Sequence, residues 1–283
     1  MQTLRALITL VLFFGLTLPL MPVQLLLLWT SRRAARLFPC WYHRLVCRII
    51  GIRIHAEGEI SADKPVLIVA NHVSWLDIPV LSAIAPVSFV AKREVGTWPF
   101  VSWLAKLQRS VFVDRQRRAS VNGTAEEIMR RLREGDRIVL FAEGTSGDGN
   151  RVLPFQSSLF AAAKPGRRSN ADDKGIYVQT LALAYTHAHG VPLAYRDRPL
   201  IAWYGDMELA GHVWSVLKRT PLDVHVRISR PVAMERFPDR KALARFCEEQ
   251  VRRDLSLLIS NRHPGAGTAR AAGEALDPGP NRD

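Results

Sequence analysis

The chain has 283 residues and a formal net charge of +13. This length accommodates one large α/β domain with appended segments. The charge requires an acidic partner, and nucleic acid, anionic lipid and an acidic carrier protein all meet that requirement. The three cysteines are scattered along the chain, which argues against a disulfide framework or a metal site and favours a reducing compartment.

The first predicted element is the stretch from Ala6 to Trp29, which contains no charged residue and is long enough to span a bilayer. Pro19 and Pro22 can kink or divide it, so a re-entrant hairpin is an alternative. A secretory signal peptide fits less well, because the apolar region is too long and SRRAAR follows it. Only Arg5 precedes the stretch whereas several arginines follow, and this asymmetry places the body of the protein in the cytoplasm.

The next stretch, Leu37 to Ile54, mixes aromatic residues with arginines. One interpretation is an interfacial helix with its tryptophan and tyrosine at headgroup depth, and the other is a basic amphipathic helix of the core. We therefore predict that residues 1–53 form membrane or interfacial helices and that residues 54–260 form an α/β domain. Residues 261–283 are rich in Gly, Pro and Ala and are predicted to be a disordered tail.

A buried strand is predicted at Val66 to Val69, and the polar residues Asn71 and His72 follow it. Ser74 and Asp77 have the spacing of a capping box that opens a helix, although the start can slip to Asp77. Because His72 precedes this helix, its ring can fold back to Asp77. A carboxylate on one ring nitrogen fixes the tautomer and leaves the other nitrogen as a general base. The alternative is a turn histidine beside a helix-capping aspartate.

Short apolar strands and helices alternate through the rest of the chain. The predicted strands are Val87–Ala91, Val111–Val113, Arg137–Ala142, Tyr177–Tyr185 and Leu222–Ser229, and the predicted helices are Thr124–Arg133, after a break at Asn122-Gly123, and Asp239–Ile259. This alternation predicts an α/β fold with a mainly parallel central sheet flanked by helices, preceded by an N-terminal membrane helix or helical hairpin. Tyr177–Tyr185 is expected to be central and Leu222–Ser229 an edge or half-buried strand. The histidines at 187, 189 and 212 are interpreted as loop or surface residues.

A glycine-rich segment follows the predicted strand Arg137–Ala142. Glu143 stands at the strand end, and the glycines at 144, 147 and 149 leave the backbone free to present amide groups to a ligand oxygen. Amides near Gly144 are candidates to hold an oxyanion. The alternative is a simple surface turn. Since open α/β sheets bind ligands at the carboxyl ends of their strands, we favour a functional site.

Four blocks of the sequence resemble the glycerolipid acyltransferase family, which includes the bacterial lysophosphatidic acid acyltransferases. They are Asn71–Asp77, Lys92–Glu94, Val111–Arg115 and Glu143–Thr145, and they occur in the family's order within Ile54 to Tyr185. The resemblance implies that His72 is the general base and that Asp77 orients it. It also implies substrate-binding residues, namely Lys92, Glu94, Arg115, Glu143, Gly144, Thr145 and Ser146.

The chain departs from the family pattern where a phosphate would be bound. Pro-Glu-Gly-Thr-Arg becomes Ala142–Ser146, and Phe-Lys-x-Gly becomes Phe155–Ser158. The lost arginine and lysine are the cations that would contact the acceptor's phosphate, each worth about 1.5–3 kcal/mol. A phosphate-free acceptor explains both losses. With Trp203–Leu209, this tract resembles the lyso-ornithine lipid O-acyltransferase branch, in which a 3-hydroxy fatty acid amide-linked to ornithine is esterified. Candidates for the ornithine ammonium are Glu143, Asp148 and Asp206.

The resemblance implies a bacterial inner-membrane enzyme with its catalytic domain on the cytoplasmic face. It would move an acyl chain from acyl-ACP or acyl-CoA to a lyso-lipid hydroxyl, without a cofactor, a metal or an acyl-enzyme, and the basic surface suits acidic acyl carrier protein. The alternatives are a lysophosphatidic acid acyltransferase with its phosphate on Arg109, Arg115 and Arg151, a lipid hydrolase, and a non-catalytic membrane-anchored binding protein. The basic residues are spread along the chain rather than grouped in a nucleic-acid motif, so no nucleic-acid partner is expected.

Overall fold

The computed structural model describes residues 1–114, 118–162 and 175–260, with the backbone alone at 118–122 and 161–162. The predicted tail therefore lies outside the described residues. The helices are α1 (Gln2–Thr30), α2 (Arg32–Ile50), α3 (Asp77–Ile84), α4 (Val101–Leu107), α5 (Arg118–Arg133), α6 (Leu209–Arg219) and α7 (Arg240–Ile259). The strands are β1 (Ile52–Glu57), β2 (Val66–Ala70), β3 (Ser88–Lys92), β4 (Val111–Val113), β5 (Ile138–Phe141), β6 (Tyr177–Ala188), β7 (Val191–Pro192), β8 (Leu222–Ile228) and β9 (Val232–Ala233).

The strands form one sheet in the order β1-β8-β6-β2-β5-β3-β4, with β7 and β9 paired to β6. From β6 to β4 all neighbours are parallel, whereas β8 is antiparallel to β6 and parallel to β1. This confirms the prediction of a mainly parallel sheet. Strand β6 lies in the interior of the sheet and is buried along most of its length, as its near-continuous apolar sequence predicts.

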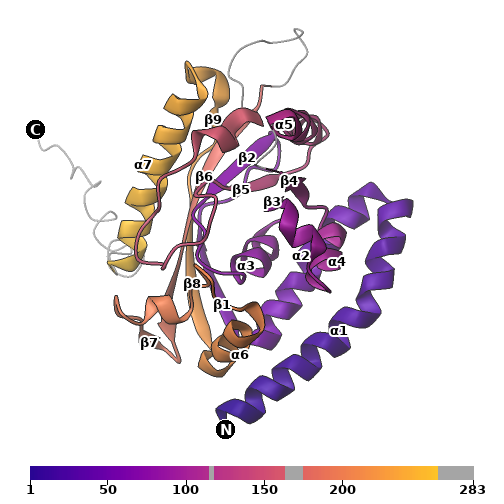
Figure 1. Cartoon of the computed structure of the whole chain (residues 1–283), viewed down its shortest axis with the longest axis vertical. Coiled ribbons are helices and arrows are strands. Elements are labelled where there is room, and N and C mark those ends of the chain that lie inside the picture. Colours follow the sequence, from indigo (N-terminus) through magenta and orange to yellow (C-terminus); the bar gives the residue numbers. More distant parts are fainter. Residues whose placement is uncertain (115–117, 163–174, 261–283) are drawn as a thin grey trace, which may run out of the picture.

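Helices cover both faces of the sheet (Figure 1). Residues of α2, α3 and α6 pack in one buried cluster on one face, and residues of α5 and α7 pack in a second cluster on the other. Along β2, Ile68 belongs to the first cluster and Leu67 and Val69 to the second, because successive strand residues point to opposite faces. Because both faces of β2 are buried, each of its successive residues has to be apolar, which explains the run of four aliphatic residues from Val66 to Val69.

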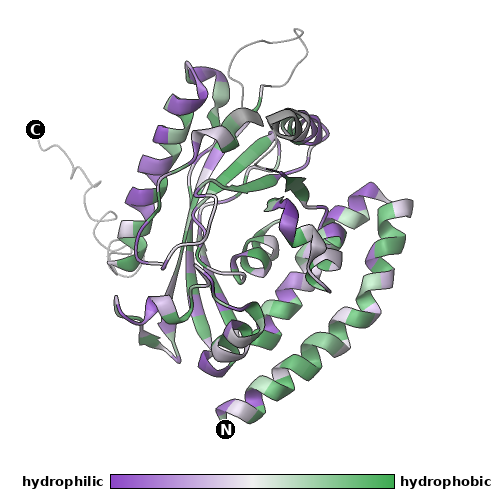
Figure 2. Ribbon diagram, in the orientation of Figure 1, coloured by the Kyte–Doolittle hydropathy of each residue, from purple (hydrophilic) through white to green (hydrophobic). Residues whose placement is uncertain are grey.

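Helix α1 exposes apolar residues and buries polar ones. Thr17 Oγ1 lies 2.7 Å from Tyr42 Oη, and Gln24 Nε2 donates to the carbonyls of Ala35 (3.0 Å) and Leu107 (2.9 Å). Its exposed residues are Leu4, Leu7, Ile8, Val11, Leu12, Phe14, Leu18, Val23, Leu25, Leu26 and Trp29, and Figure 2 shows the hydrophobic colouring along the helix. This distribution, with apolar residues outside and polar residues inside, is the reverse of that of a helix on a water-soluble domain. It is typical of a helix in contact with lipid.

Helix α1 runs through Pro19 and Pro22 without a break and contains an 18-residue window of mean hydropathy 2.2, so its length and composition allow it to cross a bilayer. It is nevertheless held to the domain near both ends. Arg5 Nη2 donates to the Lys218 carbonyl at the end of α6 (3.1 Å), and Gln24 is bonded to the end of α4. Only Ser31 separates α1 from α2. Helix α1 is therefore not divided at its prolines, as the re-entrant alternative held, and together with α2 it forms a helical hairpin packed along the domain.

The stretch Leu37 to Ile54 is not one helix. Helix α2 ends at Ile50, and Gly51, whose φ of +86° suits only glycine well, turns the chain into β1. The predicted domain boundary after residue 53 therefore falls inside a strand of the sheet. Helix α2 has the features of both earlier interpretations, because Arg44 Nε donates inward to the Ala83 carbonyl (2.8 Å) while Trp41 is exposed.

Two other predictions of local structure are wrong, and a third, for β8, holds in one of its two alternatives. Helix α5 runs through Asn122-Gly123 rather than starting at Thr124, because one glycine inside a helix costs only about 1 kcal/mol. Strand β8 is half-buried as one alternative held, but it is not an edge strand, since β1 covers its outer side. His187 lies in β6, and His212 lies in α6, where its Nδ1 accepts a bond from Trp75 (3.1 Å); neither is a loop residue.

Candidate active site

His72 and Asp77 meet at the carboxyl end of β2. The Nδ1 atom of His72 lies 2.7 Å from Oδ2 of Asp77. Asp77 is fully buried, whereas the His72 side chain is 20% exposed. Because a carboxylate can only accept, the bond requires the proton on Nδ1, and this leaves the lone pair on Nε2. The imidazole is therefore fixed in the tautomer of a general base and remains accessible.

Four donors converge on the Asp77 carboxylate. Besides His72, the backbone N–H groups of Val73 (2.7 Å) and Ser74 (3.0 Å) donate to Oδ2, and the hydroxyl of Tyr185 donates to Oδ1 (2.8 Å). Helix α3 begins at Asp77 itself, so only the half of the predicted capping box that runs from the acidic side chain to the Ser74 amide is formed. Asp77 thus holds the turn that carries His72 as well as the ring.

The imidazole ring is also positioned by packing. It stacks on Phe141 at the end of β5, with ring centroids 4.1 Å apart and planes at 16°, and Phe89 of β3 stacks behind Phe141 at 6.1 Å. Asn71 extends the pairing of β2 with β6, because its side chain accepts from the Leu183 amide (2.9 Å) and donates to the Leu183 carbonyl (3.0 Å). Of the two polar residues that follow β2, Asn71 therefore extends the sheet through its side chain, and His72 presents its ring at the edge of the sheet.

Two distant loops are tied to the backbone of this turn. The Gly147 amide donates to the His72 carbonyl (2.8 Å), and the Trp203 amide donates to the Val73 carbonyl (2.9 Å). Ser146 joins the two loops, since its hydroxyl donates to the Trp203 carbonyl. The Gly144 amide is also engaged, with the Phe141 carbonyl (3.1 Å), so the amides of Gly144 and Gly147 both have acceptors within the protein.

Glu143 lies beside the dyad, buried at 3% exposure. Its pKa is raised to about 9, mainly by burial and to a smaller extent by the carboxylates of Asp77 and Asp148, while the backbone amides of His72 and Leu153 offset part of the rise. Neither amide makes a hydrogen bond of good geometry, and neither carboxyl oxygen has a partner among the described residues. Glu143 therefore carries its proton at neutral pH.

Replacing Glu143 by glutamine is expected to stabilise the protein more as the pH rises. The carboxyl has a pKa of 4.5 when it is exposed to water and about 9 when folded, so between these values the folded state binds the extra proton. The stability of the wild type then falls as the pH rises through this window, by at most about 1.4 kcal/mol per pH unit, and glutamine removes that dependence. Thermal unfolding of both proteins at about pH 5.5 and about pH 8 measures the difference. An equal difference at the two pH values would contradict the raised pKa of the buried Glu143.

The other residues singled out in the sequence lie along the same edge of the sheet or outside the described residues. Lys92 ends β3 and Glu94 follows it, and both are exposed. Strand β3 is separated from β2 by β5, so these two residues lie two strands from His72. Gly144 is buried with a φ of +76°, and Thr145 is exposed. Arg115 lies outside the described residues.

Arg109 does not lie with the dyad. It precedes β4, and its guanidinium is bonded to Asp136, which precedes β5, at 2.7 Å. The amino ends of parallel strands lie at the opposite edge of the sheet from their carboxyl ends, so Arg109 cannot contact a phosphate held at His72. The interpretation that placed Arg109 in the phosphate site is wrong.

Two participants of the site were not identified from the sequence, Tyr185 and Trp203. Tyr185 ends a predicted aliphatic strand, and a buried tyrosine hydroxyl needs a partner, which is the signal that could have identified it. Burial raises the pKa of Tyr185 well above its usual range, so the hydroxyl remains a donor to Asp77. Trp203 contacts the turn of His72 through its backbone, while its ring packs on Trp98, and no pattern of residue types marks such a backbone contact.

The arrangement supports removal of a proton from a hydroxyl at the carboxyl edge of the sheet. His72 Nε2 is the accepting atom, and Asp77 faces the charge that forms on the ring. The cysteines do not compete as nucleophiles, since all three are buried and burial raises the pKa of each thiol, that of Cys47 to about 12.

Comparisons with known proteins agree with this chemistry. A family model described as Acyltransferase matches residues 51–184. The lyso-ornithine lipid O-acyltransferase of Brucella abortus is 44% identical over 265 residues, which cover 93% of this chain and 99% of that protein. The protein of the same name from Rhizobium meliloti is 40% identical and covers 91% of this chain and 87% of its own length. The crystal structure of the 1-acyl-sn-glycerophosphate acyltransferase of Thermotoga maritima has a TM-score of 0.65 at 22% identity, covering 91% of this chain and 98% of that chain, and shows the same fold.

Proposed function

This chain belongs to the acyltransferase family, and from that premise we propose that it transfers a fatty acyl chain to the hydroxyl of lyso-ornithine lipid, giving ornithine lipid. The observation that carries acyl transfer is the His72–Asp77 contact of 2.7 Å at an accessible sheet edge. The relatives named for lyso-ornithine lipid cover more than nine-tenths of this chain, which supports the choice of acceptor.

In the proposed reaction, His72 Nε2 removes the proton of the acceptor hydroxyl as its oxygen attacks the carbonyl carbon of an acyl thioester. The C–S bond breaks, the ester forms, and the proton passes from the imidazolium to the departing thiolate. Asp77 stabilises the imidazolium between these two steps. Acceptor and donor react directly, so no acyl-enzyme forms.

The chemistry around Ser146 supports an acceptor without a phosphate. At the position where the family pattern has an arginine, the Ser146 hydroxyl donates to the Trp203 carbonyl. The serine hydroxyl is thus occupied by the protein and brings no positive charge. Of the candidates for the ornithine ammonium, Glu143 is protonated when the site is empty, Asp148 is half-buried and Asp206 is exposed.

Offered both acceptors with one donor, the wild type is expected to acylate lyso-ornithine lipid in preference to lysophosphatidate. Replacing Ser146 by arginine should shift the ratio of the two rates about tenfold towards lysophosphatidate, because a charge-assisted bond to phosphate is worth about 1.5–3 kcal/mol. Mass spectrometry of the two products in one competition assay measures both ratios. A wild type that prefers lysophosphatidate would assign the chain to the alternative reaction, and free fatty acid released at the transfer rate would indicate a hydrolase.

We also propose acyl carrier protein as the donor and the cytoplasmic face of the bacterial inner membrane as the location. The net charge of +13 suits an acidic carrier protein. The exposed apolar side of α1 suits the bilayer, and the excess of arginine after α1 suits the cytoplasmic side. Parallel assays with acyl-ACP and acyl-CoA at low and high salt test the donor, since steering by charge weakens with salt.

A further inference from the structure

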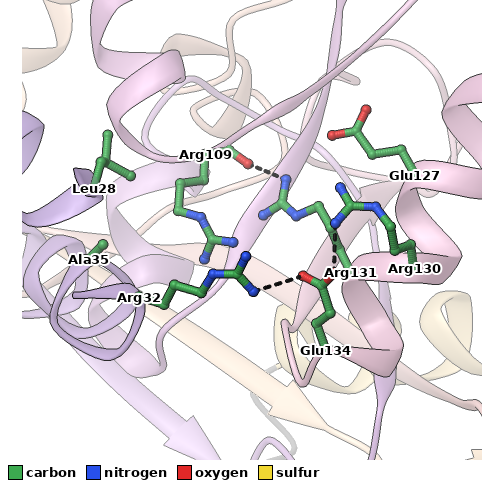
Figure 3. Close-up of a pocket in the computed structure, with 8 residues that line it drawn as sticks. All are labelled: Leu28, Arg32, Ala35, Arg109, Glu127, Arg130, Arg131 and Glu134. Carbon is green, nitrogen blue, oxygen red and sulfur yellow. Dashed lines mark hydrogen bonds and ion pairs between the residues drawn. The ribbon is translucent and has the colours of Figure 1, made fainter. Parts of the chain in front are cut away.

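A cavity of about 280 Å³ lies at the edge of the sheet opposite the dyad, between the α1–α2 hairpin and α5. Figure 3 shows arginine side chains from three parts of the chain around this space. The residues that line it are Leu28, Arg32, Ala35, Arg109, Glu127, Arg130, Arg131 and Glu134. We call this site the arginine pocket. The acyl-transfer mechanism makes no use of it.

Positive charge exceeds negative charge around the arginine pocket. Its lining contains four arginines and two glutamates. Beside it the buried Asp136 accepts bonds from Arg109 (2.7 Å) and Arg131 (2.8 Å) and pairs with Arg36 (2.7 Å). One carboxylate therefore faces three guanidinium groups. An excess of buried and half-buried positive charge is costly unless an anion offsets it.

Arg109 is held in a backbone conformation that non-glycine residues rarely adopt. Its φ is +60°, in the left-handed region that favours glycine. Two contacts hold it there, the bond of its own guanidinium to Asp136 and a bond of 2.6 Å from Arg131 Nη1 to its carbonyl. An arginine in a left-handed conformation indicates a role for the side chain that outweighs the backbone strain.

Arg32 supplies donors that the protein itself does not use fully. Its side chain is 81% exposed, and its ion pair with Glu134 is loose at 3.9 Å. Figure 3 shows its guanidinium pointing into the same space as that of Arg109. Arg130, at 60% exposure, pairs with Glu134 from the other side. Two exposed arginines at the opening, Arg32 and Arg130, and two more deeply placed ones, Arg109 and Arg131, suit an anion that enters from outside.

The pocket opens where the chain leaves the lipid-facing helix. Leu28 belongs to the last turn of α1, and the next residue, Trp29, is 84% exposed. Tryptophans gather at the depth of the lipid headgroups, and arginines just beyond an apolar helix reach lipid phosphates. A concave site at this depth fits one phosphate group of a membrane lipid, whereas an acidic protein surface needs a broad convex contact.

We propose that the arginine pocket binds the headgroup phosphate of an anionic phospholipid and so anchors the α1–α2 hairpin to α5. The lipid is a fixed component of the enzyme rather than a substrate, since it lies at the opposite edge of the sheet from His72. The proposal does not depend on which acceptor the dyad acylates.

The test is native mass spectrometry of the full-length protein released from vesicles of phosphatidylglycerol and phosphatidylcholine in equal amounts. The wild type should retain one phosphatidylglycerol in preference to phosphatidylcholine. The double variant Arg32→Gln with Arg130→Gln alters exposed residues and should lose about tenfold of this preference. Arg109→Gly relieves the positive φ while it removes a guanidinium, so it should fold and also lose preference. The matched control, Arg240→Gln on the exposed start of α7, should match the wild type.

Each other outcome overturns the proposal. Equal retention of the two lipids by the wild type, or an unchanged preference in both pocket variants, would show that the pocket does not select anionic lipid. Displacement of the bound species by millimolar inorganic phosphate would identify a soluble anion as the occupant. Loss of binding to acyl carrier protein in the variants, with lipid retention unchanged, would identify an acidic protein instead.

Discussion

Replacing His72 by alanine is expected to abolish acyl transfer while the protein stays folded and on the membrane. The change removes the only group of the dyad that can take the hydroxyl proton, and general base catalysis is worth about 10²–10⁴-fold in rate. The turn should survive, because Asp77 keeps three of its four donors, from Val73, Ser74 and Tyr185. The measurement is formation of ornithine lipid from lyso-ornithine lipid and acyl-ACP, in membranes that contain equal amounts of each protein.

A matched histidine variant separates this effect from a general loss of histidine. His189 is exposed and has a φ of +53°, a conformation that asparagine adopts readily, so His189→Asn should keep full activity. Membrane fractionation of both variants checks that each remains bound. If the alanine variant at His72 keeps more than about a tenth of the wild-type rate, proton removal by His72 is not the basis of catalysis.

The position of the dyad could be predicted from sequence because it depends on local geometry. His72 and Asp77 are five residues apart, and the strand, turn and helix that carry them lie within one short stretch. Provided that the helix begins after His72, the imidazole ring can reach the Asp77 carboxylate regardless of how the rest of the chain folds. The parallel sheet was predictable for a similar reason, since runs such as Val66–Val69 can be buried on both faces only in a covered sheet.

The partners of the dyad could not be predicted, because they depend on the order of the strands. Tyr185 reaches Asp77 across 108 positions of sequence, and it does so because β6 lies beside β2. The same pairing places the Leu183 backbone within reach of the Asn71 side chain. Hydrophobic patterns identify strands but do not show which strands lie next to each other in the sheet. Arg109 was assigned to the wrong edge of the sheet because the sequence around a basic residue does not show at which end of the parallel strands its side chain will lie.

Asp77→Asn is expected to lower the transfer rate by about 10²–10³-fold in a protein that still folds. The two backbone N–H groups of Val73 and Ser74 both point at Oδ2, so the asparagine oxygen should take that place and its NH₂ group should face Tyr185. His72 can then still donate from Nδ1, and its tautomer is kept. What is lost is the negative charge beside the imidazolium, and an adjacent opposite charge shifts such an equilibrium by about 1–3 pKa units.

Two further variants separate charge from architecture. Asp77→Ala leaves the amides of Val73 and Ser74 buried without an acceptor, at about 1–3 kcal/mol each, so it should lower the unfolding temperature as well as the rate. Tyr185→Phe removes one bond to Oδ1 and keeps the charge, so its rate should fall no more than about tenfold. The order of rates should therefore be wild type, Tyr185→Phe, then Asp77→Asn. If Asp77→Asn is as active as Tyr185→Phe, the carboxylate serves only to hold the turn, and the imidazolium forms without help from its charge.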